Sequence, residues 1–253
     1  MTWRLRTSSR EVRVVTRAAQ VAVLAGMVAA AAMAGPVSGR VELRDSKDPA
    51  VRKGLDYSGV VVWLEPVNAA LPPARTGLKA RMDQRNKTFV PHVLAVEAGT
   101  SIDFPNSDPI FHNAFSNYNG RQFDIGLYPP GSSKSVLFGR PGIVRVFCNI
   151  HASMSAVIVV LDTPYYATTQ KDGTYRIANV PPGTYQLRVF HERATEATLT
   201  QAAKLITVDS GPMVAPALPI SESGYLAIPH SNKFGHDYHD PPDENGVYPA
   251  VHK

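Results

Sequence analysis

The stretch from Cys148 to Met154 brings together three side chains that bind soft metal ions: the Cys148 thiol, the His151 imidazole and the Met154 thioether. One Cys and two His in a trigonal arrangement, with a weak axial Met, form the ligand set of blue-copper electron-transfer sites. This set needs one more His. His112 lies far upstream, as a ligand supplied by a different strand would. The four residues are therefore predicted to hold a copper ion.

Cys148 is the only cysteine among the 253 residues, so no intramolecular disulfide can form. Exported proteins usually pair their thiols, which leaves a lone Cys to be buried and inert, free and reactive, or bound to a metal. The neighbouring His151 and Met154 favour the metal. A Cys–His hydrolase would also need a general base and an oxyanion site beside the thiol, and no pattern in the sequence supplies them.

The elements that carry these residues are predicted to be strands, because short apolar or alternating runs are separated by Gly, Pro, Asn and Asp. Residues 142–148 alternate, which turns Val144, Val146 and Cys148 toward one face and Arg145 toward the other. Cys148 thus ends a strand with its sulfur pointing inward. Residues 68–85 are expected to be a connection. Further strands are expected at residues 60–64, 89–96, 101–104 and 155–161.

The order of motifs resembles a cupredoxin: His112-Asn113 after a Phe-Pro-Asn strand end, a Pro-Gly turn, an alternating strand, and Cys-x-x-His-x-x-Met. The spacing is similar to the amicyanin-like branch and to methylamine-utilization-type cupredoxin proteins. This resemblance implies a Greek-key sandwich holding one type 1 copper, with His112, Cys148 and His151 as trigonal ligands and Met154 as the axial ligand. It also implies that Asn113 lies next to the site and ties the two ligand loops together.

Residues 167–189 are predicted to form a strand, an Asp-Gly turn, a strand, a Pro-Pro-Gly turn and another strand. This pattern resembles the transthyretin-like, carboxypeptidase-regulatory-like β-sandwich, a family that is mostly structural or binding. A unit of roughly 55 residues is small for an independent core. It is therefore expected to dock on the cupredoxin-like region and to recruit the early strand at residues 39–43. His191-Glu192 is interpreted as a solvated or capping pair.

Residues 1–34 are predicted to be a signal peptide, because an Arg-rich start with Glu11 as its one acid is followed by an uncharged run and an Ala-x-Ala site. The run is short and Ala-rich for a membrane span. A periplasmic protein without a retained anchor is expected. The predicted boundaries are 1–34 for the signal peptide, 35–162 for a cupredoxin-like copper domain with an N-terminal extension, 163–220 for the transthyretin-like unit and 221–253 for a tail.

The tail contains His230, His236, His239 and His252 and few large aliphatic residues. It is interpreted as an extended strap, and weak metal capture is the alternative. Three tyrosines are expected to anchor the strap: Tyr225, Tyr238 and Tyr248.

The charge balance narrows the possible partners. Five of the 26 basic residues and one of the 21 acidic residues lie in residues 1–34, so the remainder has a formal net charge of only +1. Such a protein has no electrostatic footprint for nucleic acid. The predicted function is a non-enzymatic carrier that cycles Cu(I)/Cu(II) and exchanges single electrons with a redox partner protein.

Two alternatives to the electron carrier remain. One is a non-redox copper-binding or copper-delivery protein. The absence of Met-rich or Cys-rich runs argues against it, since only Met82, Met154 and Met213 lie beyond residue 34. The other is a structural cell-envelope interaction module on a cupredoxin scaffold.

Overall fold

A computed structural model of the chain describes residues 34–54, 56–117, 121–226 and 230–238. Apart from Ala34, the expected signal peptide lies outside the described residues. Within the described ranges, no helix combines the length and apolarity that crossing a membrane requires. The helices described are short, α1 (Pro49–Arg52) and α2 (Glu196–Ala202), and most other elements are strands. The expectation of an all-β chain is confirmed.

Strands from the middle of the chain form what we call the central sandwich, which has one sheet in the order β10-β7-β3, another in the order β6-β12-β11-β8-β9, and the hairpin β4-β5. The sheets share one core, which includes Phe104, Val146 and Ile158. The strands are β3 (Lys79–Arg81), β4 (Asp83–Arg85), β5 (Thr88–Val90), β6 (Val93–Glu97), β7 (Thr100–Pro105), β8 (Phe115–Ser116), β9 (Phe123–Asp124), β10 (Ser133–Phe138), β11 (Gly142–Phe147) and β12 (Ser155–Leu161).

The alternation predicted for residues 142–148 is present in β11, where Val144 and Val146 are buried and Arg145 is half-buried. β11 pairs antiparallel with β12, and β12 pairs with β6 on its other edge. Both faces of β12 are covered: Ile158 packs into the central core, and Val159 packs into a smaller cluster with residues of β2 and β15. This double burial explains the continuous apolar sequence of β12.

Two sequence-based predictions for this sandwich are wrong in detail. The expected strand at residues 89–96 is divided between β5 and β6, because Pro91 lacks the N–H needed to continue a ladder. The expected connection at residues 68–85 contains β3 and β4. These two strands are only three residues long and have few apolar residues, so neither periodicity nor hydrophobicity marks them.

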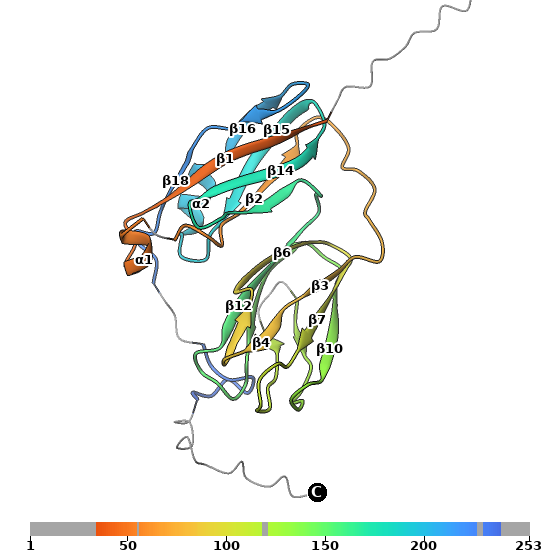
Figure 1. Ribbon diagram of the computed structural model, residues 1–253, viewed down its shortest axis with the longest axis vertical. Coiled ribbons are helices and arrows are strands. Elements are labelled where there is room, and N and C mark those ends of the chain that lie inside the picture. The colour runs from red at the N-terminus through yellow and green to blue at the C-terminus, as the bar shows by residue number, and fades with distance from the viewer. Residues whose placement is uncertain (1–33, 55, 118–120, 227–229, 239–253) are drawn as a thin grey trace, which may run out of the picture. The chain divides into compact units, whose positions relative to one another are not determined.

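Strands from both ends of the described chain form what we call the split sandwich (Figure 1), with sheets in the order β14-β1-β17 and β13-β2-β15-β16. β18 also pairs with β1. The strands are β1 (Gly35–Arg44), β2 (Val61–Pro66), β13 (Tyr166–Thr168), β14 (Thr174–Val180), β15 (Gly183–Phe190), β16 (Lys204–Val208), β17 (Met213–Val214) and β18 (Leu218–Ser221).

The strand pairing departs from the predicted boundary at residue 162. β1 pairs antiparallel with β14, so the early strand is recruited as expected. β2, which was assigned to the cupredoxin-like region, instead pairs with β13 and β15. Its residues Val62 and Leu64 pack with Leu187 in the core of the split sandwich. The central sandwich is therefore inserted between β2 and β13 of the split sandwich.

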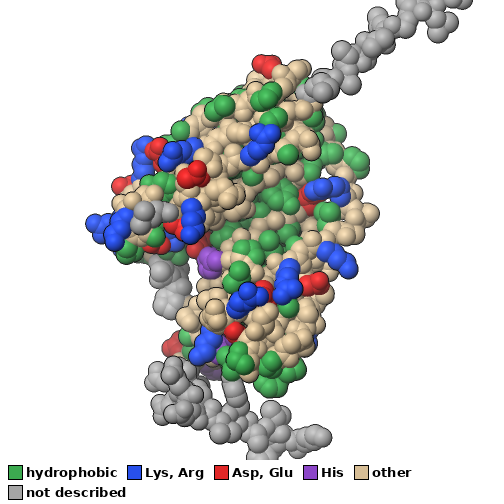
Figure 2. All heavy atoms as spheres, viewed as in Figure 1, with side chains coloured by type: hydrophobic (Ala, Val, Ile, Leu, Met, Phe, Trp, Pro, Cys, Tyr) green, Lys and Arg blue, Asp and Glu red, His purple; other side chains and the backbone are tan. Residues whose placement is uncertain are grey.

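The described residues of the two sandwiches belong to one compact unit, and they share contacts. Val61 and Phe190 of the split sandwich cluster with Val157, Val159 and Leu161 of the central sandwich. On the face shown in Figure 2, basic and acidic side chains are interspersed, which agrees with the nearly balanced charge beyond residue 34.

Candidate metal centre

Three of the predicted ligands come together at one end of the central sandwich. The ligand atoms of His112, Cys148 and His151 all lie within 4.8 Å of one another. The Cys148 Sγ is 3.8 Å from Nδ1 of His112 and 3.5 Å from Nδ1 of His151. Metal–sulfur and metal–imidazole bonds of about 2.3 and 2.0 Å add to at most about 4.3 Å. Both sulfur–nitrogen separations are short enough for one ion to bind the sulfur and each nitrogen.

Local hydrogen bonds hold the loop that follows β11. The Cys148 N–H donates to the Met154 carbonyl (3.1 Å), and the Met154 N–H donates to the His151 carbonyl (3.0 Å). These bonds close the loop between the last residue of β11 and the first residue of β12. The Met154 side chain is fully buried in the same core cluster as Cys148. The predicted axial ligand is thus inside the sandwich, on a loop fixed at both ends.

His112 reaches the site from the loop between β7 and β8. Its backbone pairs with Tyr128, through N–H to carbonyl bonds of 3.2 and 2.9 Å. Its side chain is fully buried, and its Nε2 lies 2.7 Å from a carboxylate oxygen of Asp108. An ionised carboxylate only accepts hydrogen bonds, so Nε2 carries the proton and Nδ1 presents its lone pair toward Cys148.

Asn113 links the two ligand loops. Its side-chain carbonyl accepts a hydrogen bond from the Asn149 N–H (3.2 Å), one residue after Cys148, and its amide donates to Asp124 (2.7 Å). Backbone N–H groups of Ile150, Asn113 and His151 are also directed at the Cys148 sulfur. This geometry agrees with the role that the resemblance implied for Asn113. Such contacts stabilise a thiolate and restrict its movement.

The electrostatics of the site favour neutral imidazoles. Burial lowers the pKa of His112, and burial together with the neighbouring His112 lowers the pKa of His151 to about 4. Burial raises the pKa of Cys148 above its ordinary value despite the backbone N–H groups. Burial alone would also raise the pKa of Asp108, but hydrogen bonds from Lys87, His112 and Asn86 lower it. Without metal at neutral pH, the site therefore holds two neutral His, a protonated thiol and a carboxylate.

The described part of the tail lies against the ligand loop. The Tyr238 hydroxyl donates to the Cys148 carbonyl (2.7 Å), and the Lys233 N–H donates to the Asn149 side chain (2.9 Å). The His230 ring stacks on Phe147 with 4.1 Å between ring centroids. These contacts agree with the strap interpretation. Among described residues the metal-type cluster contains no His of the tail. Tyr248, His239 and His252 lie outside the described residues.

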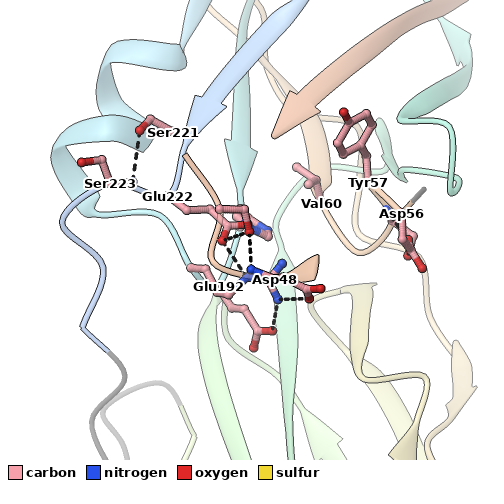
Figure 3. Close-up of polar contacts among 12 residues, drawn as sticks. Asp48, Asp56, Tyr57, Val60, Glu192, Ser221, Glu222 and Ser223 are labelled. Atoms are coloured by element: carbon pink, nitrogen blue, oxygen red, sulfur yellow. Dashed lines mark hydrogen bonds and ion pairs between the residues drawn. The ribbon is translucent and has the colours of Figure 1, made fainter. Parts of the chain in front are cut away.

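A second polar cluster lies in the split sandwich (Figure 3). His191 is buried, with its Nε2 2.9 Å from Glu222, and Glu222 also accepts hydrogen bonds from Arg193 (3.0 Å) and Ser46 (2.6 Å). Glu192 binds His92 of the central sandwich at 2.9 Å. The interpretation of His191-Glu192 as a solvated or capping pair is wrong, because each residue has its own long-range partner.

Asp108 was not among the residues predicted for the site, whereas His112, its hydrogen-bond partner, was. The available signal was local, an acid four residues before the candidate ligand His112. The other partners of Asp108 are backbone N–H groups of Asn86 and Lys87, at 2.6 and 2.8 Å. Those groups form the turn between β4 and β5, and β4 was not predicted, so the sequence offered no reason to expect a buried carboxylate there.

The known proteins that this chain resembles are solved structures, and each of those described below matches only part of the chain. No protein-family model matches the sequence, and no curated protein matches it. Solved structures that are similar include a purple cupredoxin from Nitrosopumilus maritimus, at 21% identity and a TM-score of 0.30, covering 32% of this chain and 99% of that chain. A Cu(I) amicyanin mutant is 15% identical, with a TM-score of 0.31, covering 40% of this chain and 98% of that chain.

A copper-containing nitrite reductase from Thermus scotoductus SA-01 is 23% identical, with a TM-score of 0.33, covering 48% of this chain and 28% of that chain. This chain therefore spans about a quarter of that enzyme's length. Because these TM-scores are low, the functional assignment rests on the side-chain geometry of the site. The transthyretin-like resemblance of the C-terminal strands stays a prediction.

Proposed function

We propose that the chain is a periplasmic type 1 copper protein that carries single electrons between Cu(I) and Cu(II) for a redox partner protein. The observation that supports it most is that His112, Cys148 and His151 each place a ligand atom within 4.8 Å of the other two. Thiolate and imidazole together suit copper in both oxidation states, and a thioether such as that of Met154 is the usual weak fourth ligand. Copper bound there would supply the one-electron chemistry.

The protein around the cluster supports electron transfer over catalysis. His112, Cys148 and Met154 are buried, and backbone hydrogen bonds hold the segments that carry them, which restricts changes in ligand geometry when the oxidation state changes. His151 is half-buried, so it is the ligand of the cluster that reaches solvent. We assign His151 as the point at which electrons enter and leave.

The test is to add Cu(II) to the purified protein and to record visible absorption and EPR spectra. We expect intense thiolate-to-copper absorption and narrow copper hyperfine splitting, both lost in Cys148→Ser. A colourless protein that binds only Cu(I) would contradict electron transfer and support copper delivery. A protein that binds no copper would support the structural module.

The axial position is tested separately, by measuring the reduction potential of Met154→Gln. An oxygen ligand in place of the thioether favours Cu(II), so the potential should fall while the colour remains. Met213→Gln is the matched control, because Met213 lies in β17 of the split sandwich and should leave the potential unchanged. An unchanged potential in Met154→Gln would remove Met154 from the ligand set.

A further inference from the structure

Asp108 is a buried carboxylate that contacts the candidate copper site through the His112 side chain. Its Oδ2 lies 2.7 Å from Nε2 of His112 on the side of the ring opposite the Cys148 sulfur. Only 5% of Asp108 is exposed. A carboxylate is costly to bury without hydrogen-bond donors. The surroundings of Asp108 therefore need to provide several.

The β4–β5 hairpin provides two of them. Asn86 and Lys87 form its two-residue loop, and both have φ near +54°, which is the geometry of a type I′ turn. Their N–H groups donate to Oδ1 and Oδ2 of Asp108 at 2.6 and 2.8 Å. The Asp108 N–H donates in turn to the Asn106 side chain at 3.1 Å. Both carboxylate oxygens and the backbone of Asp108 are therefore fixed without any metal.

This fixed carboxylate determines which nitrogen of His112 is available to a metal. The Nε2–H donates to Asp108, so the ring is held as the tautomer whose lone pair is on Nδ1. A hydrogen bond from Nε2–H to a carboxylate also makes Nδ1 a stronger electron donor. A stronger donor and a nearby negative charge both stabilise Cu(II) more than Cu(I).

The geometry points to Asp108 as a positioning residue that orients His112 and lowers the reduction potential of the bound copper, with the β4–β5 hairpin as its anchor. This inference rests on the proposed function. Through Asp108, the turn of the β4–β5 hairpin would then influence the redox chemistry of the site. His151 has no comparable carboxylate in the described structure, so the two imidazoles donate unequally.

The experiment compares copper-loaded Asp108→Asn with Asp83→Asn. Asp83 is the matched control: it lies on the same hairpin, is 6% exposed, and binds Ser107, Arg81 and Arg85 and makes no bond to His112. Losing an outer hydrogen-bond partner of a ligand typically changes metal affinity about 10- to 100-fold. If Asp108→Asn weakens Cu(II) binding tenfold relative to Cu(I), the potential rises by about 59 mV.

The blue colour should persist in both variants, and only Asp108→Asn should show the higher potential. Equal shifts in the two variants, or no shift in Asp108→Asn, would overturn the inference while leaving the copper site intact. Absence of blue copper in the unmodified protein would instead overturn the proposed function.

A measurement on the unmodified protein covers the case in which Asp108→Asn does not fold. In the diamagnetic Cu(I) form, ¹⁵N-edited NMR should show a proton on Nε2 of His112 that exchanges slowly, because it is buried and bound to Asp108. The Nε2 proton of half-buried His151 should exchange faster. An unprotonated His112 Nε2 would overturn the inference.

Discussion

Each sandwich contains a buried His–carboxylate pair, and only one of the two pairs belongs to a candidate metal site. His112–Asp108 lies in the central sandwich at 2.7 Å, and His191–Glu222 lies in the split sandwich at 2.9 Å. All four side chains are at most 5% exposed. Burial is the leading cause that lowers the pKa of both His112 and His191. By burial and hydrogen bonding alone the two pairs are nearly equivalent.

They differ in what surrounds them. On the Nδ1 side of His112 lie a thiol and a second imidazole, whereas Glu222 of the other pair also binds the guanidinium of Arg193. A resident cation satisfies the carboxylate and repels a metal ion. The His191–Glu222 pair, which also binds a cation, is therefore structural. The His112–Asp108 pair, which lies beside a thiol and a second imidazole, can support a metal ligand.

Replacing each His in turn tests whether only one of the two pairs supports a metal site. His112→Gln should abolish the blue colour, with a loss of copper affinity larger than the roughly 10- to 100-fold that an outer partner costs. His191→Gln should leave the copper spectrum unchanged, because no ligand-type cluster in the described chain includes His191. Copper titration followed by visible absorption measures both. Loss of colour in His191→Gln with the fold intact would contradict the distinction.

The second prediction concerns stability. Glu222→Gln should lower the free energy of unfolding by about 2–3 kcal/mol, because it removes the carboxylate charge that binds both buried His191 and Arg193. Glu65→Gln is the matched control: its ion pair with Arg188 is exposed, and the loss should stay below about 1 kcal/mol. Urea unfolding of the metal-free proteins measures both. Similar losses in the two variants would show that the Glu222 cluster is not a stabilising centre.

The sequence was informative where chemistry and pattern are local. The alternation predicted for residues 142–148 turns Cys148 inward, and Cys148, which directly follows β11, is buried. His151, three residues later, lies beside it. His112 joins them because β8 pairs with β11 through Phe115 and Phe147. The paired residues are more than thirty positions apart in the chain. The residue type therefore made His112 a candidate ligand, but no local pattern predicted that it would lie beside Cys148.

The sequence was uninformative where partners are distant. β2 pairs with β15 about 120 residues later, as in Glu65 with Gln186, so grouping strands by proximity assigned β2 to the wrong sandwich. Consecutive strands are neighbours in only about two-thirds of cases. Asp108 was missed for the same reason, because its backbone donors Asn86 and Lys87 lie more than twenty residues away in the chain.

The third prediction concerns the number of protons released when copper binds. Because His112 and His151 have lowered pKa values and Cys148 has a raised one, copper binding near neutral pH displaces one proton, from the thiol. Affinity should rise about tenfold per pH unit between about pH 6 and 8. Ordinary imidazoles would steepen the dependence toward three protons below about pH 6.5. Competition against a chelator at fixed ionic strength measures the slope, and two or more protons released near pH 6 would contradict neutral imidazoles.

The smallest effect is expected from a third His–carboxylate pair, His92–Glu192, which joins the two sandwiches and is half exposed on the His side. The hydrogen bond that His92 donates to Glu192 raises the pKa of His92. Burial alone would raise the pKa of Glu192, but the hydrogen bond and the charge of His92 lower it. The His92 contribution to stability is therefore fully present below its unfolded pKa near 6.5 and is lost as pH rises through the raised folded value. Solvent screening limits it to less than about 1 kcal/mol.

His92→Gln should therefore lower the free energy of unfolding more at about pH 5.5 than at about pH 9. The loss is small because an exposed pair retains its water, whereas the two buried pairs have exchanged water for fixed partners. Urea unfolding of metal-free protein at the two pH values measures the difference, with Lys204→Gln in β16, which makes no described ion pair, as a control for general charge effects. A larger loss of unfolding free energy at the higher pH would mean that His92 is neutral in the folded protein. The exposed pair would then resemble the two buried pairs, whose His residues have lowered pKa values.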